Sequence, residues 1–378
     1  MTETVAKAAF SIETGRLVLT LMPSLRCKHD CPHCYLSREQ RDDPSILPLR
    51  ELERICLSIA EWKEKRRLPA LSVEAYWYGG EPTTLGIEYF EAACDLMERV
   101  FPRKNGNALR QTVLSSLVGV DPAWRKVFRA RCDGAVQTSY DGLMRGSGYL
   151  RRWSAEVKAA VDDGLRVSTI SVVNSELVAA GPEKVLDELI ALGVSETSWL
   201  PFMRNGQNDS GAYARFAPDM NAYSDFMIRL TERAIELRSE GVAVPEIGQA
   251  RFIIAQARAE GLSNIAGQTL FLMPDGSFQL PDYEDGWKER MLSFGNGLLL
   301  PFEKILSSPE RRAYLRRQTL RNGNPECLEC PHGDKCLMEF WKPNRPGDDC
   351  FGARRYVEWT LERAAAIAPP DDGATKLY

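Results

Sequence analysis

The chain carries no large excess of charge of one sign, because its 48 Lys and Arg residues face 52 Asp and Glu residues, for a net charge of −4. It therefore lacks the basic footprint of a nucleic-acid-binding protein. It also has no run of eighteen apolar residues, so we expect no membrane span. Residues 1–13 contain no apolar stretch long enough for a secretory signal, and we expect a cytoplasmic protein with neither nucleic acid nor membrane among its partners.

The chain has no repeats and no low-complexity segment, but it does have ten cysteines in its 378 residues. Seven of them fall into two groups, which in a reducing compartment indicates metal binding rather than disulfides. The other three, Cys56, Cys94 and Cys132, are expected to be buried as small apolar side chains.

The first group reads Cys27-x3-Cys31-x2-Cys34 and follows an apolar run that ends at Met22. Three thiolates bind three irons of a [4Fe–4S] cube and leave the fourth iron open to another ligand. Zinc remains an alternative at this point, because His29 or His33 would supply a fourth ligand.

A second motif, Gly79-Gly80-Glu81-Pro82, follows a strand-like run that starts at Val73. Two glycines let the backbone approach a ligand closely, and Glu81 places a fixed carboxylate there, suited to an ammonium group. Taken alone, the same four residues also describe an ordinary turn at the end of a strand.

Together the two motifs resemble the radical S-adenosylmethionine (SAM) superfamily. The resemblance implies that the amino and carboxylate groups of SAM chelate the open iron. It also implies that Gly79, Gly80 and Glu81, followed by Pro82, hold the SAM ammonium, and that the backbone at Tyr35 contacts adenine. A reducing electron donor such as flavodoxin or ferredoxin is implied as a partner.

Six strand-like runs alternate with helix-like runs, near residues 16–22, 73–78, 111–118, 135–139, 166–173 and 197–202. Repeated strand–helix units predict parallel strands with right-handed crossovers. We interpret these strands as covered on both faces. The fold class predicted is α/β, a partial (β/α)6 TIM-like barrel that matches the core of the resembled superfamily, followed by a small C-terminal domain. In parallel barrels the chemistry gathers at the carboxyl ends of the strands.

Helix signals are clearest where apolar residues recur at three- and four-residue steps, as from Leu49 to Trp62. Ser154 is expected to cap one helix, and Pro182 and Gly193 to begin and end another. Beyond the barrel (residues 14–219) we expect a helical linker (220–265), an auxiliary-cluster domain with a hairpin at 268–280 (266–360) and a tail (361–378).

The second cysteine group comprises Cys327, Cys330, Cys336 and Cys350. Four thiolates close either a zinc site or a [4Fe–4S] cluster, and the spacing alone favours zinc. The group resembles the SPASM and twitch extensions of radical SAM enzymes, however, which implies one auxiliary [4Fe–4S] cluster. Pro281 and Phe340 stand where a full SPASM domain has ligands of a second cluster, so only one is expected.

Ser139-Tyr140-Asp141-Gly142 resembles the Ser-x-Asp-Gly motif of SPASM-type enzymes, in which the serine and aspartate line the SAM and substrate cavity. The His-Asp and Arg that often follow this motif are missing here. An ordinary Asp-Gly turn is the alternative interpretation.

Barrel geometry places three further SAM-binding candidates at strand ends: Ser116, Asn174 and Arg204. Asp282 follows Pro281 at the position where anaerobic sulfatase-maturing enzymes have a proposed general base. The same residues are also typical of a solvated acidic loop, which is the alternative interpretation. The arginines from Arg311 to Arg321 are interpreted as the solvated face of a helix, with docking of an acidic leader peptide as the alternative.

The function implied is cleavage of SAM to a 5′-deoxyadenosyl radical that abstracts hydrogen from a substrate carbon. SPASM-type relatives act mostly on peptides, which favours crosslinking, cyclisation or oxidation of a ribosomally made precursor peptide. Dehydrogenation of a Ser or Cys side chain or of a small-molecule alcohol such as an aminocyclitol, and epimerisation, are alternatives. A zinc-binding scaffold without catalysis is the alternative from a different class.

Overall fold

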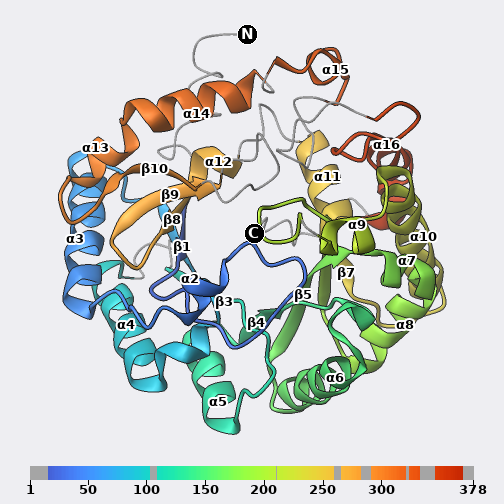
Figure 1. The fold of residues 1–378 in the computed structure, drawn as a ribbon, viewed down its shortest axis with the longest axis horizontal. Helices are drawn as coiled ribbons and strands as arrows, with labels where there is room; N and C mark the ends of the chain where they lie inside the picture. The colour runs from blue at the N-terminus through green and yellow to red at the C-terminus, as the bar shows by residue number, and fades with distance from the viewer. Residues whose placement is uncertain are drawn as a thin grey trace.

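A computed structural model describes residues 16–102, 109–209, 211–258, 265–281, 291–320, 323–332 and 345–368. Strands form a curved sheet around a central axis, and helices lie outside it (Figure 1). Two of the predicted site residues, Asp282 and Cys336, lie outside the described residues.

The predicted partial barrel is confirmed. Strands β1 (Arg16–Leu21), β2 (Ser72–Trp77) and β3 (Arg110–Val113) pair in parallel, as do β4 (Ala135–Thr138), β5 (Arg166–Val173) and β6 (Glu196–Pro201). A single parallel bridge from Leu114 to Gln137 joins β3 to β4. The six strands therefore follow one another in chain order around the barrel.

The sheet continues beyond these six strands on both sides. The short strand β7 (Glu246–Ile247) pairs in parallel with β6, and β8 (Thr269–Leu272) pairs in parallel with β1. β8 and β9 (Ser277–Pro281) form the predicted hairpin, and β10 (Met291–Asn296) adds a further antiparallel strand. The hairpin thus extends the sheet of the barrel, and neither β7 nor β10 was predicted.

Helices on the outer face of the barrel bury one side each. On α3 (Leu49–Lys65) the predicted stripe is buried through Leu52, Ile55, Ile59 and Trp62. The other helices around the six strands are α4 (Ile87–Val100), α5 (Pro122–Arg131), α6 (Ser147–Asp162), α7 (Ser175–Ala180) and α8 (Pro182–Leu192). Outside this set lie α2 (Arg38–Asp42), α9 (Ala212–Phe216), α10 (Met220–Ser239), α11 (Gly248–Arg258), α12 (Ile265–Gln268), α13 (Phe302–Leu306), α14 (Pro309–Thr319), α15 (Pro325–Leu328), α16 (Arg354–Glu362) and α17 (Ala364–Ile367).

The helix boundaries agree with the sequence in one place and not in another. Helix α8 begins at Pro182 and ends at Gly193, whose φ of 76° suits a glycine at a helix terminus. The prediction that Ser154 caps a helix is wrong, because α6 already begins at Ser147. The buried Trp153 extends the apolar face of this helix one turn further toward its N-terminus.

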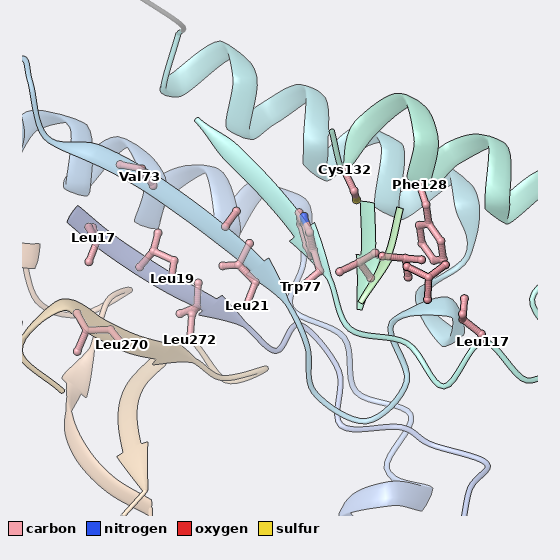
Figure 2. Close-up of a cluster of buried hydrophobic side chains, with 14 of the residues drawn as sticks. Leu17, Leu19, Leu21, Val73, Trp77, Leu117, Phe128, Cys132, Leu270 and Leu272 are labelled. Atoms are coloured by element: carbon pink, nitrogen blue, oxygen red, sulfur yellow. The ribbon is translucent and has the colours of Figure 1, made fainter. Parts of the chain in front are cut away.

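The two faces of the strands differ in polarity. Val73, Ala75 and Trp77 of β2 are buried under the outer helices, whereas the alternate residues Glu74 and Tyr76 are half-buried. Figure 2 shows the buried side chains of β1, β2 and β8 in this core, where apolar surface leaves water. The interpretation of strands covered on both faces therefore holds only in part, since the alternate, inner residues of β2 are more accessible than the outer ones.

The three cysteines outside the two groups and the arginines of α14 differ in how deeply they are buried. Cys56, Cys94 and Cys132 are buried, as predicted. Arg312 on α14 is exposed, but Arg311 is buried and donates hydrogen bonds to the carbonyl oxygens of Leu306 and Gly267. The solvated-face interpretation is therefore wrong for Arg311. In the part of the chain that the structure describes, no helix is long and apolar enough to cross a membrane.

Two aspartates from distant parts of the chain cap the N-terminus of α10. Asp219 accepts from the backbone N–H of Ala222 at 2.7 Å, and Asp348 accepts from those of Met220 and Asn221 at 3.2 and 2.8 Å. We expect Asp348→Ala to lower the free energy of unfolding by about 1–2 kcal/mol, because two helix-terminal N–H groups lose their acceptor. Chemical denaturation measures this; Asp348→Asn, which keeps an acceptor, should lose less, and equal stability of all three proteins would contradict the capping role.

Candidate active site

The first cysteine group lies on the loop between β1 and α2. The backbone N–H of Cys27 donates to the carbonyl oxygen of Arg41 at 3.0 Å, and that of Cys34 to Cys31 at 3.0 Å. All three thiols are free and half-buried. Burial raises the pKa of Cys27 to about 11 and that of Cys31 to about 12, so a metal that binds here must displace their protons.

The donor set of this loop consists of three thiols, which fits a [4Fe–4S] cube whose fourth iron is left open. Within the described residues, no three His, Cys, Asp or Glu side chains lie close enough to hold one metal ion. A zinc ion draws its sulfur ligands to about 2.3 Å from one point, whereas an iron–sulfur cube binds each thiolate at a different iron. Of the two possible fourth zinc ligands, His29 has its Nε2 atom 2.7 Å from the Ser116 hydroxyl, whereas the Nδ1 atom of His33 is buried with no hydrogen-bond partner among the described residues.

Gly79 and Gly80 lie directly against the backbone that leads into the cysteine loop. The N–H of Gly80 donates to the Ser24 carbonyl oxygen at 3.4 Å, and that of Glu81 to Arg26 at 2.9 Å. A Cβ atom on Gly80 would lie 2.2 Å from the carbonyl oxygens of Leu25 and Arg26. The glycines are therefore required by the contact between two backbone segments, a reason that their motif alone did not reveal.

Gly80→Ala should consequently displace the loop that carries the cysteines. We expect the free energy of unfolding to fall by about 1–3 kcal/mol, the usual range for overpacking, because the clash is with backbone atoms. Gly148 in α6 is the matched control, since a Cβ there meets nothing nearer than 4.0 Å and alanine favours a helix. Chemical denaturation of both variants checks this, and a Gly80→Ala protein as stable as Gly148→Ala would contradict it.

Glu81 is buried, with 7% exposure, where β2, β3 and the cysteine loop meet. Its carboxylate accepts hydrogen bonds from the Ser115 hydroxyl at 2.8 Å and from the backbone N–H of Ser116 at 2.8 Å. The Nε2 atom of His29 lies 4.0 Å away. β3 ends at Val113, earlier than expected, and the contact at Ser116 brings the predicted residues Glu81 and Ser116 together. Pro82 begins the 3-10 turn η2 (Pro82–Leu85) that Glu81 caps.

Asp141, a predicted site residue, forms a buried ion pair with Arg145, a residue that the motif comparison overlooked. Asp141 is 3% exposed and the side chain of Arg145 is 7% exposed. Arg145 also donates to the Tyr149 hydroxyl at 2.6 Å. Both charges act on the pKa of Cys31, so the pair lies beside the cysteine loop. The Arg145 Nε and Asp141 Oδ1 atoms are buried with no hydrogen-bond partner in the described residues, which leaves them available to a bound ligand.

The remaining predicted SAM contacts fall in different surroundings. The ring of Tyr35 stacks on Tyr78 with centroids 6.5 Å apart. Ser139 is half-buried directly after β4. Arg204 is half-exposed and pairs with Asp209 in its own loop, so the structure does not bring it to the cysteine loop through any described contact.

Asn174 is fully buried and serves as the N-cap of α7. Its side-chain oxygen accepts from the N–H groups of Glu176 and Leu177, both at 3.1 Å. Its amide nitrogen donates to the carbonyl oxygens of Val172 and Asp141. A direct contact with SAM would therefore have to replace one of these four hydrogen bonds.

Asn205, which the sequence did not single out, ties the loop after β6 to the cysteine loop. It is buried, and its amide nitrogen donates to the carbonyl oxygen of His33 at 3.2 Å. Its oxygen accepts from the N–H groups of Gln207 and Asn208. Nothing in its sequence neighbourhood marks this role, because the contact joins residues 172 positions apart.

In the second cysteine group the structure describes Cys327, Cys330 and Cys350. The N–H of Cys330 donates to Cys327 at 3.4 Å, and both Cys330 and Cys350 contribute to a raised pKa of Arg354, after the larger effect of Glu358. Cys330 and Cys350 therefore lie near the same guanidinium group although twenty positions separate them. The arrangement keeps both thiols half-buried.

Comparisons with solved structures agree with this architecture, while no family model and no curated protein sequence matches the chain. Native anSMEcpe with bound AdoMet has 15% identity and a TM-score of 0.70, over 93% of this chain and 98% of that one. Native anSMEcpe with AdoMet and the Cp18Cys peptide has 15% identity and a TM-score of 0.68 over the same shares. Streptococcus suis SuiB bound to precursor peptide SuiA has 16% identity and a TM-score of 0.56, over 85% of this chain and 71% of SuiB.

At these identities the comparisons establish a shared fold. The same fold carries Cys27-x3-Cys31-x2-Cys34 and Gly79-Gly80-Glu81 at adjacent strand ends, in contact through their backbones. In its motifs and in its fold, the chain therefore resembles the SPASM/twitch-type subgroup of radical SAM enzymes.

Proposed function

We propose that this chain is a radical SAM enzyme whose cysteine loop holds a [4Fe–4S] cluster through Cys27, Cys31 and Cys34. The observation that carries the proposal is the direct packing of this loop on Gly79, Gly80 and Glu81 at the carboxyl ends of β1 and β2. When bound, the reduced cluster and SAM supply the reductive cleavage that yields a 5′-deoxyadenosyl radical able to remove hydrogen from a substrate carbon.

The residues of the chain orient the reactants and exclude water. Glu81, held by Ser115 and Ser116, presents a fixed carboxylate for the ammonium group of SAM. Asp141 and Arg145 supply a buried negative and a buried positive charge beside the cysteine loop, suited to polar groups of SAM or of the substrate. The more accessible inner face of the barrel, which includes Glu74 and Tyr76 of β2, gives the substrate a place to bind.

For the substrate we propose a ribosomally made precursor peptide, which the enzyme crosslinks, cyclises or oxidises. Support comes from SuiB, whose structure was solved with the precursor peptide SuiA. A second candidate is dehydrogenation of a Cys or Ser side chain, which the higher TM-score to anSMEcpe with the Cp18Cys peptide favours. In both cases Asp282 is the proposed general base, and a flavodoxin or ferredoxin of the cytoplasm is the proposed electron donor.

We propose further that Cys327, Cys330, Cys336 and Cys350 bind one auxiliary [4Fe–4S] cluster. Its support is the spacing of these cysteines, which resembles that of the SPASM and twitch extensions. Neighbouring Asp349 is held by the Ser224 hydroxyl at 2.6 Å, which fixes the Cys350 segment to α10. The structure thus supports a firm attachment of this segment to the barrel.

The experiment that tests the function is anaerobic reconstitution with iron and sulfide, followed by incubation with SAM and dithionite. The proposal expects methionine and 5′-deoxyadenosine in equal amounts. About eight irons per chain would indicate two [4Fe–4S] clusters, and about four would indicate that the second cysteine group holds no cluster. A colourless protein that binds zinc and leaves SAM intact would refute the function and favour the zinc scaffold.

A further inference from the structure

Helix α2 forms immediately after the third cysteine and has a complete capping box. The Ser37 hydroxyl accepts from the backbone N–H of Gln40 at 3.2 Å, and the Gln40 side chain accepts from the backbone N–H of Ser37 at 2.9 Å. This short helix is therefore fixed from within. It carries Arg41 back over the loop from which it starts.

Arg41 holds the cysteine loop at two places. Its carbonyl oxygen accepts from the N–H of Cys27 at 3.0 Å. Its Nη1 atom donates to the carbonyl oxygen of His29 at 2.6 Å and to the carboxylate of Asp30 at 2.8 Å. The side chain is only 15% exposed, so these are contacts of a mostly buried guanidinium. One residue thus fixes both the start of the cysteine segment and the turn between its first two cysteines.

The guanidinium of Arg41 also contains an N–H donor, at Nε, that makes none of these contacts. The Nε atom of Arg41 is buried and has no hydrogen-bond partner among the residues that the structure describes. A buried donor without an acceptor is unfavourable, so it is expected where a bound group will supply the acceptor. The Arg41 carbonyl oxygen lies 3.0 Å from the backbone nitrogen of Cys27, and the guanidinium contacts His29 and Asp30, so its charge lies beside the turn between Cys27 and Cys31.

We propose that Arg41 is a positioning residue for the cluster of the cysteine loop. Its Nη1 fixes the loop, and its Nε donates to the sulfur ligands of the cluster. Hydrogen bonds to sulfur and a nearby positive charge both stabilise the form with the extra electron, which raises the reduction potential. The inference rests on the proposed function, because it requires that the loop bind an iron–sulfur cluster.

The test compares the reconstituted full chain with Arg41→Met, Arg41→Lys and Arg38→Met. Arg38 is the matched control, since it lies on the same helix with its side chain 85% exposed and pairs with Asp42. Two quantities are measured: the midpoint potential of the cluster whose electron paramagnetic resonance signal changes on addition of SAM, and the rate of iron loss to a chelator.

Arg41→Met is expected to lower the midpoint potential and to speed iron loss by about 10- to 100-fold, the usual effect of removing a group that supports metal ligands. Arg41→Lys keeps the charge without the planar fork, so its potential should lie nearer that of the parent while iron loss stays fast. Arg38→Met should match the parent in both quantities. The Lys variant keeps the test decisive if the Met variant does not fold.

An unchanged potential in Arg41→Met would overturn the inference, even if iron loss were faster, because that result describes only a structural role for the loop. If the parent cleaves SAM while its Arg41 variants keep the parental potential, the inference fails and the proposed function stands. If the parent binds no iron at the cysteine loop, the proposed function fails and this inference with it.

Discussion

Cys34→Ala should abolish the formation of 5′-deoxyadenosine from SAM. A cluster that uses three protein thiolates and reserves its fourth iron for SAM has no spare ligand among the cysteines of the loop. The imidazole of His29 already has its Nε2 atom 2.7 Å from the Ser116 hydroxyl. We therefore expect activity below detection and about four fewer irons per chain than in the parent, measured by chromatography of the products and by iron analysis.

Cys94→Ala is the control for this loss. Cys94 lies on α4 and is fully buried in the apolar core, outside both cysteine groups, so its removal should cost stability but no iron. Both variants therefore lose one thiol, and only one of them loses a proposed ligand. Equal product formation by Cys34→Ala and Cys94→Ala would show that the cysteine loop takes no part in the reaction.

The order of the strands could be predicted from the sequence because it depends on local signals. Apolar runs such as Arg16–Leu21 and Arg166–Val173 are bounded by turn residues, and helix-forming stretches of the right length separate them. The short strand β7 carries only two residues, which is too few for any periodicity. The pairing of β8 with β1 joins residues some 250 positions apart, and such a long-range contact leaves no local pattern.

The residues of the candidate site also differ in whether a local sequence pattern reveals them. Cys27, Cys31 and Cys34, and the segment from Gly79 to Glu81, are visible in the sequence because each motif is continuous. Arg145 stands four residues after Asp141, but its ion pair with Asp141 forms only in the fold, and no motif marked it. Arg41 and Asn205 donate hydrogen bonds to backbone carbonyl oxygens of the cysteine loop. Every residue has a backbone carbonyl oxygen, so the residue types of the acceptors do not reveal these contacts.

Arg145→Met should be the most destabilising substitution in the site. It would leave the Asp141 carboxylate buried without its counter-charge, and removal of one partner from a buried ion pair costs about 3–5 kcal/mol. Methionine nearly matches the length of the arginine stem, so the loss reflects the missing charge more than a cavity. The free energy of unfolding, from chemical denaturation of the protein without metal, measures the effect separately from catalysis.

Two controls identify the cause of that loss. Lys158→Met breaks the ion pair between Lys158 and Asp162, which has the same four-residue spacing but lies exposed on α6, and it should cost about 0.5 kcal/mol or less. The double variant Arg145→Met with Asp141→Asn removes both charges, so it should recover much of the stability while still losing SAM cleavage or product formation. If Arg145→Met and Lys158→Met cost the same, the pair contributes no buried charge to the site. A double variant that is stable but inactive would show that the ion pair serves the reaction and that the fold does not need it.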